Sequence, residues 1–339
     1  MELLDWKNLS FGYIKTDFNI RSVFKDGKWG PLEASSSEFI NMHIAASALH
    51  YGQEAFEGMK AYMGKDGKIR LFRWEENAKR LIHSAEGLVM AAVPVELFRE
   101  AIFKAVLLNK RFVPPFGSGA TLYVRPLLIG TGPEIGVKPA KEYTFIVFVT
   151  PVGPYFKEGF KPVDLMICRD FDRAAPKGTG TFKVGGNYAA SLRAVIDVKN
   201  KGYSNPLFLD SREKKYIDEC GAANFYGIKN NTYITPRSES ILNSVTNMSL
   251  MEIAADMGMK TERRSIPVEE LETFEEAGAC GTAAVITPIA KIWDPETNKV
   301  YDYTRNCSPG PLTIKLYNKL VSIQNGDEPD KFGWMTVIE

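Results

Sequence analysis

The stretch Gly178-Thr-Gly-Thr-Phe-Lys183-Val-Gly-Gly-Asn-Tyr188 is the most informative part of the 339-residue sequence. Glycines on both sides of a lysine let the backbone approach a planar ligand closely, because glycine reaches conformations that other residues avoid. A nucleophilic lysine must also lose its proton near neutral pH, which requires burial or a nearby cation. The residues alone leave open a surface loop with an incidental lysine. A Gly-x-x-x-x-Gly-Lys-[Ser/Thr] phosphate loop does not fit, because Val184 follows the lysine, and this argues against a nucleotide-dependent kinase.

A second block, Tyr216-Ile-Asp-Glu219-Cys-Gly-Ala-Ala-Asn224-Phe, together with Lys183-Val-Gly-Gly-Asn-Tyr, resembles the branched-chain aminotransferases among the fold-type IV pyridoxal-phosphate enzymes. The resemblance covers almost the whole chain, and further blocks follow the family order. They are His50-Tyr51-Gly-Gln-Glu-Ala-Phe56-Glu-Gly58, Leu71-Phe72-Arg73 through Arg80, Tyr123-Val-Arg125-Pro126, Val152-Gly-Pro-Tyr155-Phe and Gly281-Thr282-Ala283-Ala284. The resemblance implies transamination between branched-chain L-amino acids (leucine, isoleucine, valine) and 2-oxoglutarate, giving branched-chain 2-oxo acids and L-glutamate.

The same resemblance implies pyridoxal 5'-phosphate as the cofactor and assigns roles around its ring. Lys183 matches the Schiff-base lysine, whose amine, once displaced by substrate, shuttles a proton between Cα of the substrate and C4′ of the cofactor. Glu219 matches the carboxylate that keeps the pyridine nitrogen protonated, since an opposite charge a few ångströms away favours the charged form. Tyr188 matches the residue that hydrogen-bonds the phenolic oxygen.

The phosphate group of the cofactor is expected to meet a second set of residues. Arg80 matches the family's phosphate-binding arginine, whereas its sequence context alone favours an exposed arginine on an amphipathic helix. Val245 and Thr246 stand where the family presents backbone amides and a hydroxyl, and Thr246 begins an expected helix whose N-terminus suits an anion. Thr282 completes the phosphate set implied by the resemblance.

The substrate pocket has to accept a branched alkyl side chain and, in turn, the second carboxylate of glutamate. Phe56, Tyr123 and Tyr155 match the family's aromatic walls, although core packing explains any single aromatic about as well. Tyr51, Tyr123 and Arg125 are the expected polar contacts for the distal carboxylate. The turn Thr282-Ala283-Ala284 matches the one whose amides hold the α-carboxylate.

The loop at 130–140 carries Ile135 and Val137, which match residues that reach into the neighbouring subunit's active site in this family. A long loop without secondary structure is often functional, which agrees with this match. The resemblance therefore implies a homodimer. Two departures from relatives are visible. Ala284-Val-Ile-Thr287 lacks the Cys-x-x-Cys pair of some mammalian relatives, and Val245-Thr246-Asn247 lacks an arginine in its third position.

Composition excludes several other classes of protein. Lysine plus arginine (42) balances aspartate plus glutamate (41), so the net charge of +1 gives no basis for binding nucleic acid or an anionic membrane. Four dispersed cysteines indicate a reducing compartment, and three scattered histidines are too few for a His-rich metal site. The N-terminus lacks a signal-peptide pattern, and no apolar stretch is long enough for a membrane span. A cytoplasmic enzyme with small-molecule substrates is expected.

The organisation along the chain predicts a two-domain α+β or α/β fold. Amphipathic periodicity predicts a helix over 74–90 and another opened by Pro94, and β-branched and aromatic runs predict strands at 121–129 and 143–150. Clustered Gly and Pro place a linker at 153–162, between a small N-terminal α/β domain (1–152) and a large C-terminal domain (163–339). The family resemblance implies that the C-terminal domain is barrel-like and that the cofactor lies at the domain interface.

Three alternatives remain beside the branched-chain aminotransferase. A D-amino-acid aminotransferase or an aminodeoxychorismate lyase of the same fold would share the lysine and the glutamate, but neither is expected to carry Tyr123-Val-Arg125-Pro126 together with Val152-Gly-Pro-Tyr155. A nucleotide-dependent kinase lacks the Ser/Thr after Lys183. A non-catalytic binding protein of this fold is expected to have lost Lys183 or Glu219, and both are present.

Overall fold

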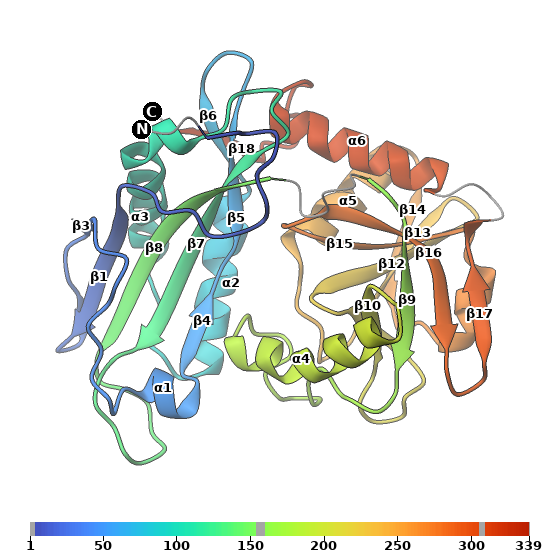
Figure 1. Ribbon diagram of the computed structural model, residues 1–339, viewed down its shortest axis with the longest axis horizontal. Helices are drawn as coiled ribbons and strands as arrows, with labels where there is room; N and C mark the ends of the chain where they lie inside the picture. The colour runs from blue at the N-terminus through green and yellow to red at the C-terminus, as the bar shows by residue number, and fades with distance from the viewer. Residues whose placement is uncertain (1–3, 154–159, 305–308, 339) are drawn as a thin grey trace. The chain divides into compact units, whose positions relative to one another are not determined.

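The structure, a computed structural model, describes residues 4–153, 160–304 and 309–338. The chain forms two compact units. The N-terminal unit comprises Met1–Lys157, Phe182–Gly185 and Ile323–Glu339. The C-terminal unit comprises Glu158–Thr181 and Gly186–Ser322. Figure 1 shows the elements of each unit along the chain.

The N-terminal unit is built on one antiparallel sheet with the strand order β18-β6-β5-β7-β8-β1-β2, to which β3 and β4 are added beside β1 and β7. Its elements are β1 (Asn19–Lys25), β2 (Lys28–Trp29), β3 (Glu33–Ser35), α1 (Ser47–Tyr51), β4 (Glu54–Phe56), β5 (Met59–Met63), β6 (Ile69–Phe72), α2 (Trp74–Gly87), α3 (Val95–Leu108), the 3-10 helix η1 (Lys110–Phe112), β7 (Thr121–Gly130), β8 (Tyr143–Val152) and β18 (Met335–Ile338). The long β7–β8 pair forms the middle of this sheet.

The two faces of this sheet have different characters. The register of β7 and β8 pairs Val124 with Val149. Both side chains belong to one apolar core that also contains residues of α2 and α3, and in this core Phe98 of α3 stacks on Phe145 of β8. Because side chains alternate along a strand, Tyr123 and Arg125 of β7 point to the opposite face. The sheet therefore packs its helices on one face and presents polar and aromatic side chains on the other.

The C-terminal unit contains a closed barrel of six strands, in which pairing runs β11-β10-β9-β16-β15-β12 and returns to β11. Its elements are β9 (Val163–Cys168), α4 (Gly185–Asn200), β10 (Asn205–Leu209), β11 (Ile217–Cys220), β12 (Ala223–Lys229), β13 (Thr232–Pro236), α5 (Val245–Asp256), β14 (Lys260–Arg264), the 3-10 helix η2 (Val268–Thr273), β15 (Glu276–Gly281), β16 (Val285–Asp294), β17 (Lys299–Asp302) and α6 (Pro311–Asn325). The barrel-like fold expected for this part of the chain is thus confirmed.

Two helical crossovers between parallel strands position candidate site residues of the chain. Strands β9 and β10 are parallel and are joined through α4, and β13 and β14 are parallel and are joined through α5. A parallel pair needs such a crossover, and the helix then begins after the carboxyl end of the first strand. Lys183 lies in the connection that leads into α4, and Val245 begins α5.

The structure departs from the expected boundaries in identifiable places. Helix α2 ends at Gly87 instead of continuing to residue 90, because Val89 has a left-handed φ of 53° that interrupts the helix. Strand β18 pairs with β6, so the C-terminal segment joins the N-terminal unit, and so does Phe182–Gly185. With these segments included, the N-terminal unit takes residues from three separate parts of the chain. Residues 154–159 of the expected 153–162 linker lie outside the described residues.

Candidate active site

Lys183 is held in the N-terminal unit by backbone hydrogen bonds on both sides of its side chain. Its amide donates to Ser84 Oγ on α2 at 2.9 Å, and its carbonyl accepts from the amide of Phe56 on β4 at 3.0 Å. Two residues further on, the amide of Gly185 donates to the carboxylate of Glu54. These bonds fix the lysine backbone to a helix and a strand that are themselves part of the core, so the amine starts from a rigid base.

The surroundings of the Lys183 amine favour its neutral form. Burial lowers the pKa of Lys183 to about 8, and the positive charges of Arg80 and Arg125 act in the same direction. Glu57 and Tyr123 oppose this lowering. The amine also lies 4.7 Å from the centre of the Phe56 ring. A lysine with this pKa has an appreciable unprotonated fraction near neutral pH, as a nucleophile or proton carrier requires.

Arg80 projects from α2 into the same region and is not the exposed arginine that its sequence context suggested. Its side chain is only 10% exposed, because its guanidinium makes a two-point ion pair with the fully buried carboxylate of Glu57. Nε donates to Oε1 at 2.7 Å and Nη2 to Oε2 at 2.8 Å. The Arg80 carbonyl accepts from Ser84 Oγ at 2.9 Å. One hydroxyl group therefore links the backbones of Arg80 and Lys183.

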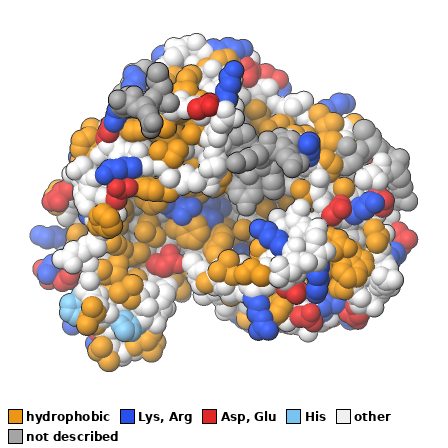
Figure 2. Space-filling model, in the orientation of Figure 1, with side chains coloured by type: hydrophobic (Ala, Val, Ile, Leu, Met, Phe, Trp, Pro, Cys, Tyr) orange, Lys and Arg blue, Asp and Glu red, His pale blue; other side chains and the backbone are white. Residues whose placement is uncertain are grey.

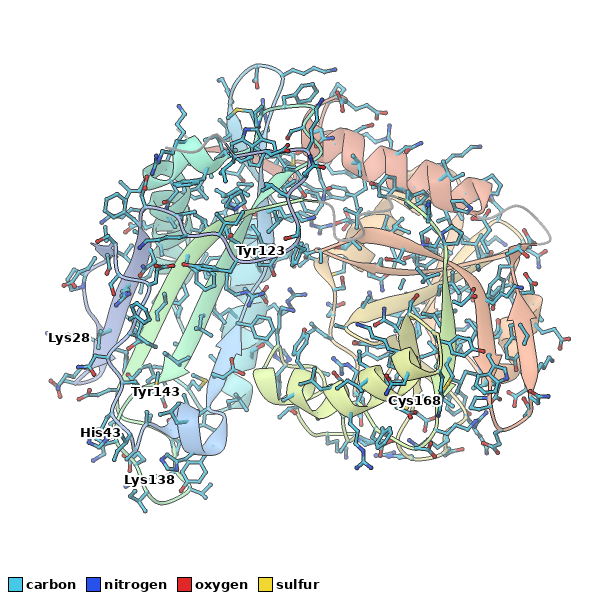
Figure 3. All side chains as sticks on the ribbon, viewed as in Figure 1. Lys28, His43, Tyr123, Lys138, Tyr143 and Cys168 are labelled. Carbon is cyan, nitrogen blue, oxygen red and sulfur yellow. The ribbon has the colours of Figure 1, made fainter. Side chains whose placement is uncertain are left out.

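Phe56, Tyr123 and Arg125 form one cluster on the helix-free face of the sheet. The Arg125 guanidinium lies over the rings of Phe56 and Tyr123, at 4.8 and 5.2 Å, and Nη2 donates to the Tyr123 hydroxyl at 3.0 Å. Tyr123, marked in Figure 3, fills the space where a side chain at Gly58 would lie, so that position requires glycine. Nε of Arg125 is buried and has no hydrogen-bond partner within the described residues. Such an orphaned donor is costly unless a ligand supplies the acceptor.

The C-terminal unit places Glu219 on β11 of the barrel, almost fully buried. One carboxylate oxygen pairs with Arg173 Nε at 2.8 Å. The other accepts from the Leu242 amide at 2.7 Å and from Asn224 Nδ2 at 3.2 Å. Arg173 is itself anchored, because its Nη1 donates to the carbonyl of Ser240 at 2.6 Å. A cation and two neutral donors engage both oxygens of this carboxylate and hold it in one orientation.

Three further features of the C-terminal unit carry the remaining cofactor and substrate candidates. Val245 and Thr246 form the buried first turn of α5, which is capped by Ser244, and helix N-termini bind anions. Thr282, Ala283 and Ala284 form the three-residue turn between β15 and β16, closed by the pairing of Gly281 with Val285. Tyr188 lies in the first turn of α4 and is partly buried.

Comparison with known proteins identifies the family. Residues 54–292 match the amino-transferase class IV family. The chain is 47% identical to the branched-chain-amino-acid aminotransferase of Haemophilus influenzae, with all of both chains covered, and 49% identical to that of Helicobacter pylori, with 99% of this chain and 98% of the relative covered. The chain belongs to the branched-chain-amino-acid aminotransferases of class IV. The resemblance recognised in the sequence is thereby confirmed.

Solved structures of the same family share its fold. The branched-chain aminotransferase of Escherichia coli superposes with a TM-score of 0.79 at 25% identity, covering 96% of this chain and 100% of that one. A T.th. branched-chain aminotransferase in complex with N-(5'-phosphopyridoxyl)-L-glutamate superposes with a TM-score of 0.77 at 26% identity, with the same coverage. The two-domain fold-type IV architecture predicted from the sequence is therefore confirmed.

Three other residues predicted for this aminotransferase site, Tyr51, Ile135 and Val137, are exposed. Tyr51, at the end of α1, is exposed, and its hydroxyl donates to the carbonyl of Ile135 in the β7–β8 loop. Ile135 and Val137 are 77% and 87% exposed. Figure 2 shows hydrophobic and histidine side chains together at this end of the N-terminal unit. Tyr155 lies outside the described residues.

Four contacting residues of the aminotransferase site were not predicted from the sequence. Glu54 and Ser84 hold the Lys183 backbone, Glu57 pairs with Arg80, and Arg173 pairs with Glu219. Glu54 and Glu57 lie inside the block 50–58 that carried the family resemblance, so a buried role for its acidic residues was a signal that could have found them. Arg173 stands ten residues before Lys183 in a segment without any recognisable pattern.

Proposed function

We propose that Lys183 is the catalytic amine of this transaminase, which transfers the amino group between branched-chain L-amino acids and 2-oxoglutarate with pyridoxal 5'-phosphate as cofactor. The single observation that carries the assignment is the buried amine with a pKa of about 8, fixed through its backbone beside Arg80, Phe56 and Arg125. An amine of this kind gives up and takes back a proton near neutral pH, as the removal of the substrate's α-proton during transamination requires.

The chemistry of the side chains present fits pyridoxal 5'-phosphate. When bound, this cofactor supplies an electron-withdrawing ring that stabilises the negative charge left when the substrate loses its α-proton. The buried, hydrogen-bonded carboxylate of Glu219 is suited to the pyridine nitrogen, and Tyr188 to the phenolic oxygen. Arg80, the first turn of α5 at Val245 and Thr246, and Thr282 supply a guanidinium, helix amides and a hydroxyl for the phosphate.

Arg125 is proposed to read the distal carboxylate of glutamate. Its buried Nε has no acceptor among the described residues, and a carboxylate is the acceptor that completes a guanidinium fork. The complex of the T.th. relative with a phosphopyridoxyl derivative of L-glutamate supports a dicarboxylic partner substrate. Phe56 and Tyr123 then provide the apolar walls for leucine, isoleucine and valine, with Tyr155 as a further wall implied by the family. The amides of the Thr282-Ala283-Ala284 turn are proposed to bind the α-carboxylate.

A homodimer is proposed as the active unit. The β7–β8 loop is bound to the segment that leads into α1, because the Glu134 amide donates to the Ala45 carbonyl at 2.8 Å while Ile135 and Val137 stay exposed. Apolar side chains presented on an ordered loop fit insertion into a second copy of the chain. The hydrogen bond from Tyr51 to Ile135 assigns Tyr51 to the same surface, so its substrate contact would be made in the partner's site.

A cytoplasmic location is also proposed, supported by dispersed cysteines that suit a reducing compartment. Cys168, Cys220 and Cys280 are free and buried. Within the described part of the chain, no helix has the length and apolar character of a membrane span.

The test of the proposed function compares amino donors in steady state with 2-oxoglutarate as acceptor, for wild type and Lys183→Ala. L-Leucine, L-isoleucine and L-valine should react, and D-alanine should not, which separates this activity from a D-amino-acid aminotransferase. Lys183→Ala should lose the visible absorbance of the bound cofactor and at least about a hundredfold in turnover, since a positioned proton carrier contributes ~10²–10⁴-fold. A variant that keeps more than about a hundredth of the wild-type rate would remove Lys183 from this role.

A further inference from the structure

Glu57 is a fully buried carboxylate to which neither the sequence nor the proposed reaction assigns a task. It lies between β4 and β5, and its two oxygens are saturated by short contacts. Oε1 accepts from Arg80 Nε at 2.7 Å, and Oε2 accepts from Arg80 Nη2 at 2.8 Å. Oε2 also accepts from Asn77 Nδ2 at 2.7 Å and from the Gly58 amide at 3.2 Å. A buried carboxylate is retained only when its hydrogen bonds are satisfied, and this one is fully engaged.

The geometry of the pair constrains Arg80 more than a single contact would. A guanidinium is planar and carries five N–H donors in a fixed fork. Glu57 occupies the edge formed by Nε and Nη2, so the plane and the rotation of the guanidinium are set. Asn77 lies one turn before Arg80 on α2 and anchors Glu57 in turn. A flexible arginine is thereby converted into a rigid one.

We propose that Glu57 is a positioning residue for the cofactor phosphate, which it serves by holding the Arg80 guanidinium in the one orientation that presents its outer edge to the phosphate. This rests on the proposed role of Arg80 as phosphate ligand. An arginine that is oriented before binding loses less side-chain freedom when the phosphate arrives, so affinity for the phosphorylated cofactor is gained without direct contact between Glu57 and the ligand.

The experiment measures binding of pyridoxal 5'-phosphate and of pyridoxal, which lacks the phosphate, to full-length protein from which cofactor has been removed. Glu57→Gln keeps the shape of the side chain but loses the charge and one acceptor. It should weaken binding of pyridoxal 5'-phosphate about tenfold or more, the usual scale of one charge-assisted hydrogen bond, and leave pyridoxal binding within about twofold. The phosphate preference, the ratio of the two dissociation constants, should fall accordingly.

Asp294→Asn is the matched control. Asp294 is 1% exposed and binds Arg169 in the same two-point manner, with contacts of 3.2 and 2.8 Å, in the C-terminal unit. Removing its charge should cost stability in a comparable way but leave the phosphate preference unchanged. Equal loss of preference in both variants would mean that any broken buried ion pair has this effect, and the positioning role of Glu57 would be overturned.

Arg80→Ala separates this inference from the proposed function beneath it. If Arg80→Ala loses the phosphate preference and Glu57→Gln keeps it, Arg80 binds the phosphate without help from Glu57, and only the inference fails. If Arg80→Ala itself keeps the preference, the phosphate role of Arg80 fails and the inference fails with it. Should Glu57→Gln not fold, Asn77→Ala decides the question, since it removes one anchor of Glu57. The phosphate preference of Asn77→Ala must also fall, and an unchanged ratio of the two dissociation constants would overturn the proposal.

Discussion

Replacing Arg125 by methionine should separate the two kinds of substrate that this aminotransferase handles. Methionine keeps an unbranched stem beside Phe56 and Tyr123 but removes the guanidinium. The protein then loses the two contacts of the guanidinium with these rings, each of about 0.5–1 kcal/mol, whichever substrate is bound. Glutamate in addition loses the partner of its distal carboxylate, at a cost of roughly 1.5–3 kcal/mol for a charge-assisted hydrogen bond. That extra cost corresponds to about a ten- to hundredfold change in the ratio of the two specificity constants.

The assay measures kcat/KM for L-glutamate and for L-leucine, each with a common 2-oxo acid acceptor, and compares their ratio between variants. The ratio cancels damage that affects both substrates equally. Arg193→Met is the matched control, because the Arg193 guanidinium also lies over an aromatic ring, that of Phe171, at 4.9 Å. Its ratio should remain that of wild type. Equal losses for glutamate and leucine in Arg125→Met would show that Arg125 supports the packing of the cluster and does not recognise the substrate.

Three further outcomes are expected. Glu219→Gln should retain cofactor binding but lose most of its turnover, because an amide cannot stabilise a pyridinium charge; unchanged steady-state turnover would place another carboxylate at the ring nitrogen. Arg173→Met should lower the free energy of unfolding by about 3–5 kcal/mol, because it leaves Glu219 as an uncompensated buried charge. Adding Glu219→Gln should restore part of this loss in denaturant titrations, and no restoration would contradict the explanation. Because burial lowers the pKa of Lys183 to about 8, the rate at which cofactor-free protein captures pyridoxal should rise about tenfold per pH unit below 8 and level off above it. A rate that keeps rising in the same way to about pH 10 would contradict the role of Lys183 as the capturing amine.

The sequence predicted those parts of the fold whose signals are local. The apolar periodicity of α2 and the β-branched runs of β7 and β8 appear in the structure close to where they were expected. Strand β18 could not be placed this way, because its partner β6 lies more than 260 residues earlier, and the residues of a four-residue strand do not specify which sheet it joins. The family resemblance supplied what periodicity could not, namely the barrel and the candidate residues of the site.

The partners of the site residues were beyond the reach of sequence reasoning for the same reason. The sequence context of Arg80 suggested an exposed helical arginine, because nothing in its own helix reveals Glu57, which lies 23 residues earlier between β4 and β5. Glu219 and Arg173 are 46 residues apart and meet only because the barrel brings β11 beside the segment after β9. The sequence pattern around a residue shows which residue types lie near it along the chain. An ion pair between two elements forms only on folding, because it depends on which segments the fold brings together.

These ion pairs also indicate which charged side chains of the site already have a charged partner within the protein. Arg80 and Glu219 each have little exposed side chain, and each forms an ion pair inside its own unit, with Glu57 and with Arg173. Burial moves Lys183 toward its neutral form. Arg125 differs from them, because no ion pair to it is found in the described part of the chain and its buried Nε lacks an acceptor. Since an unpaired buried donor costs about 1–3 kcal/mol, its persistence is explained when a substrate carboxylate completes it. The guanidinium with an unsatisfied buried Nε is therefore the one expected to select the dicarboxylic substrate.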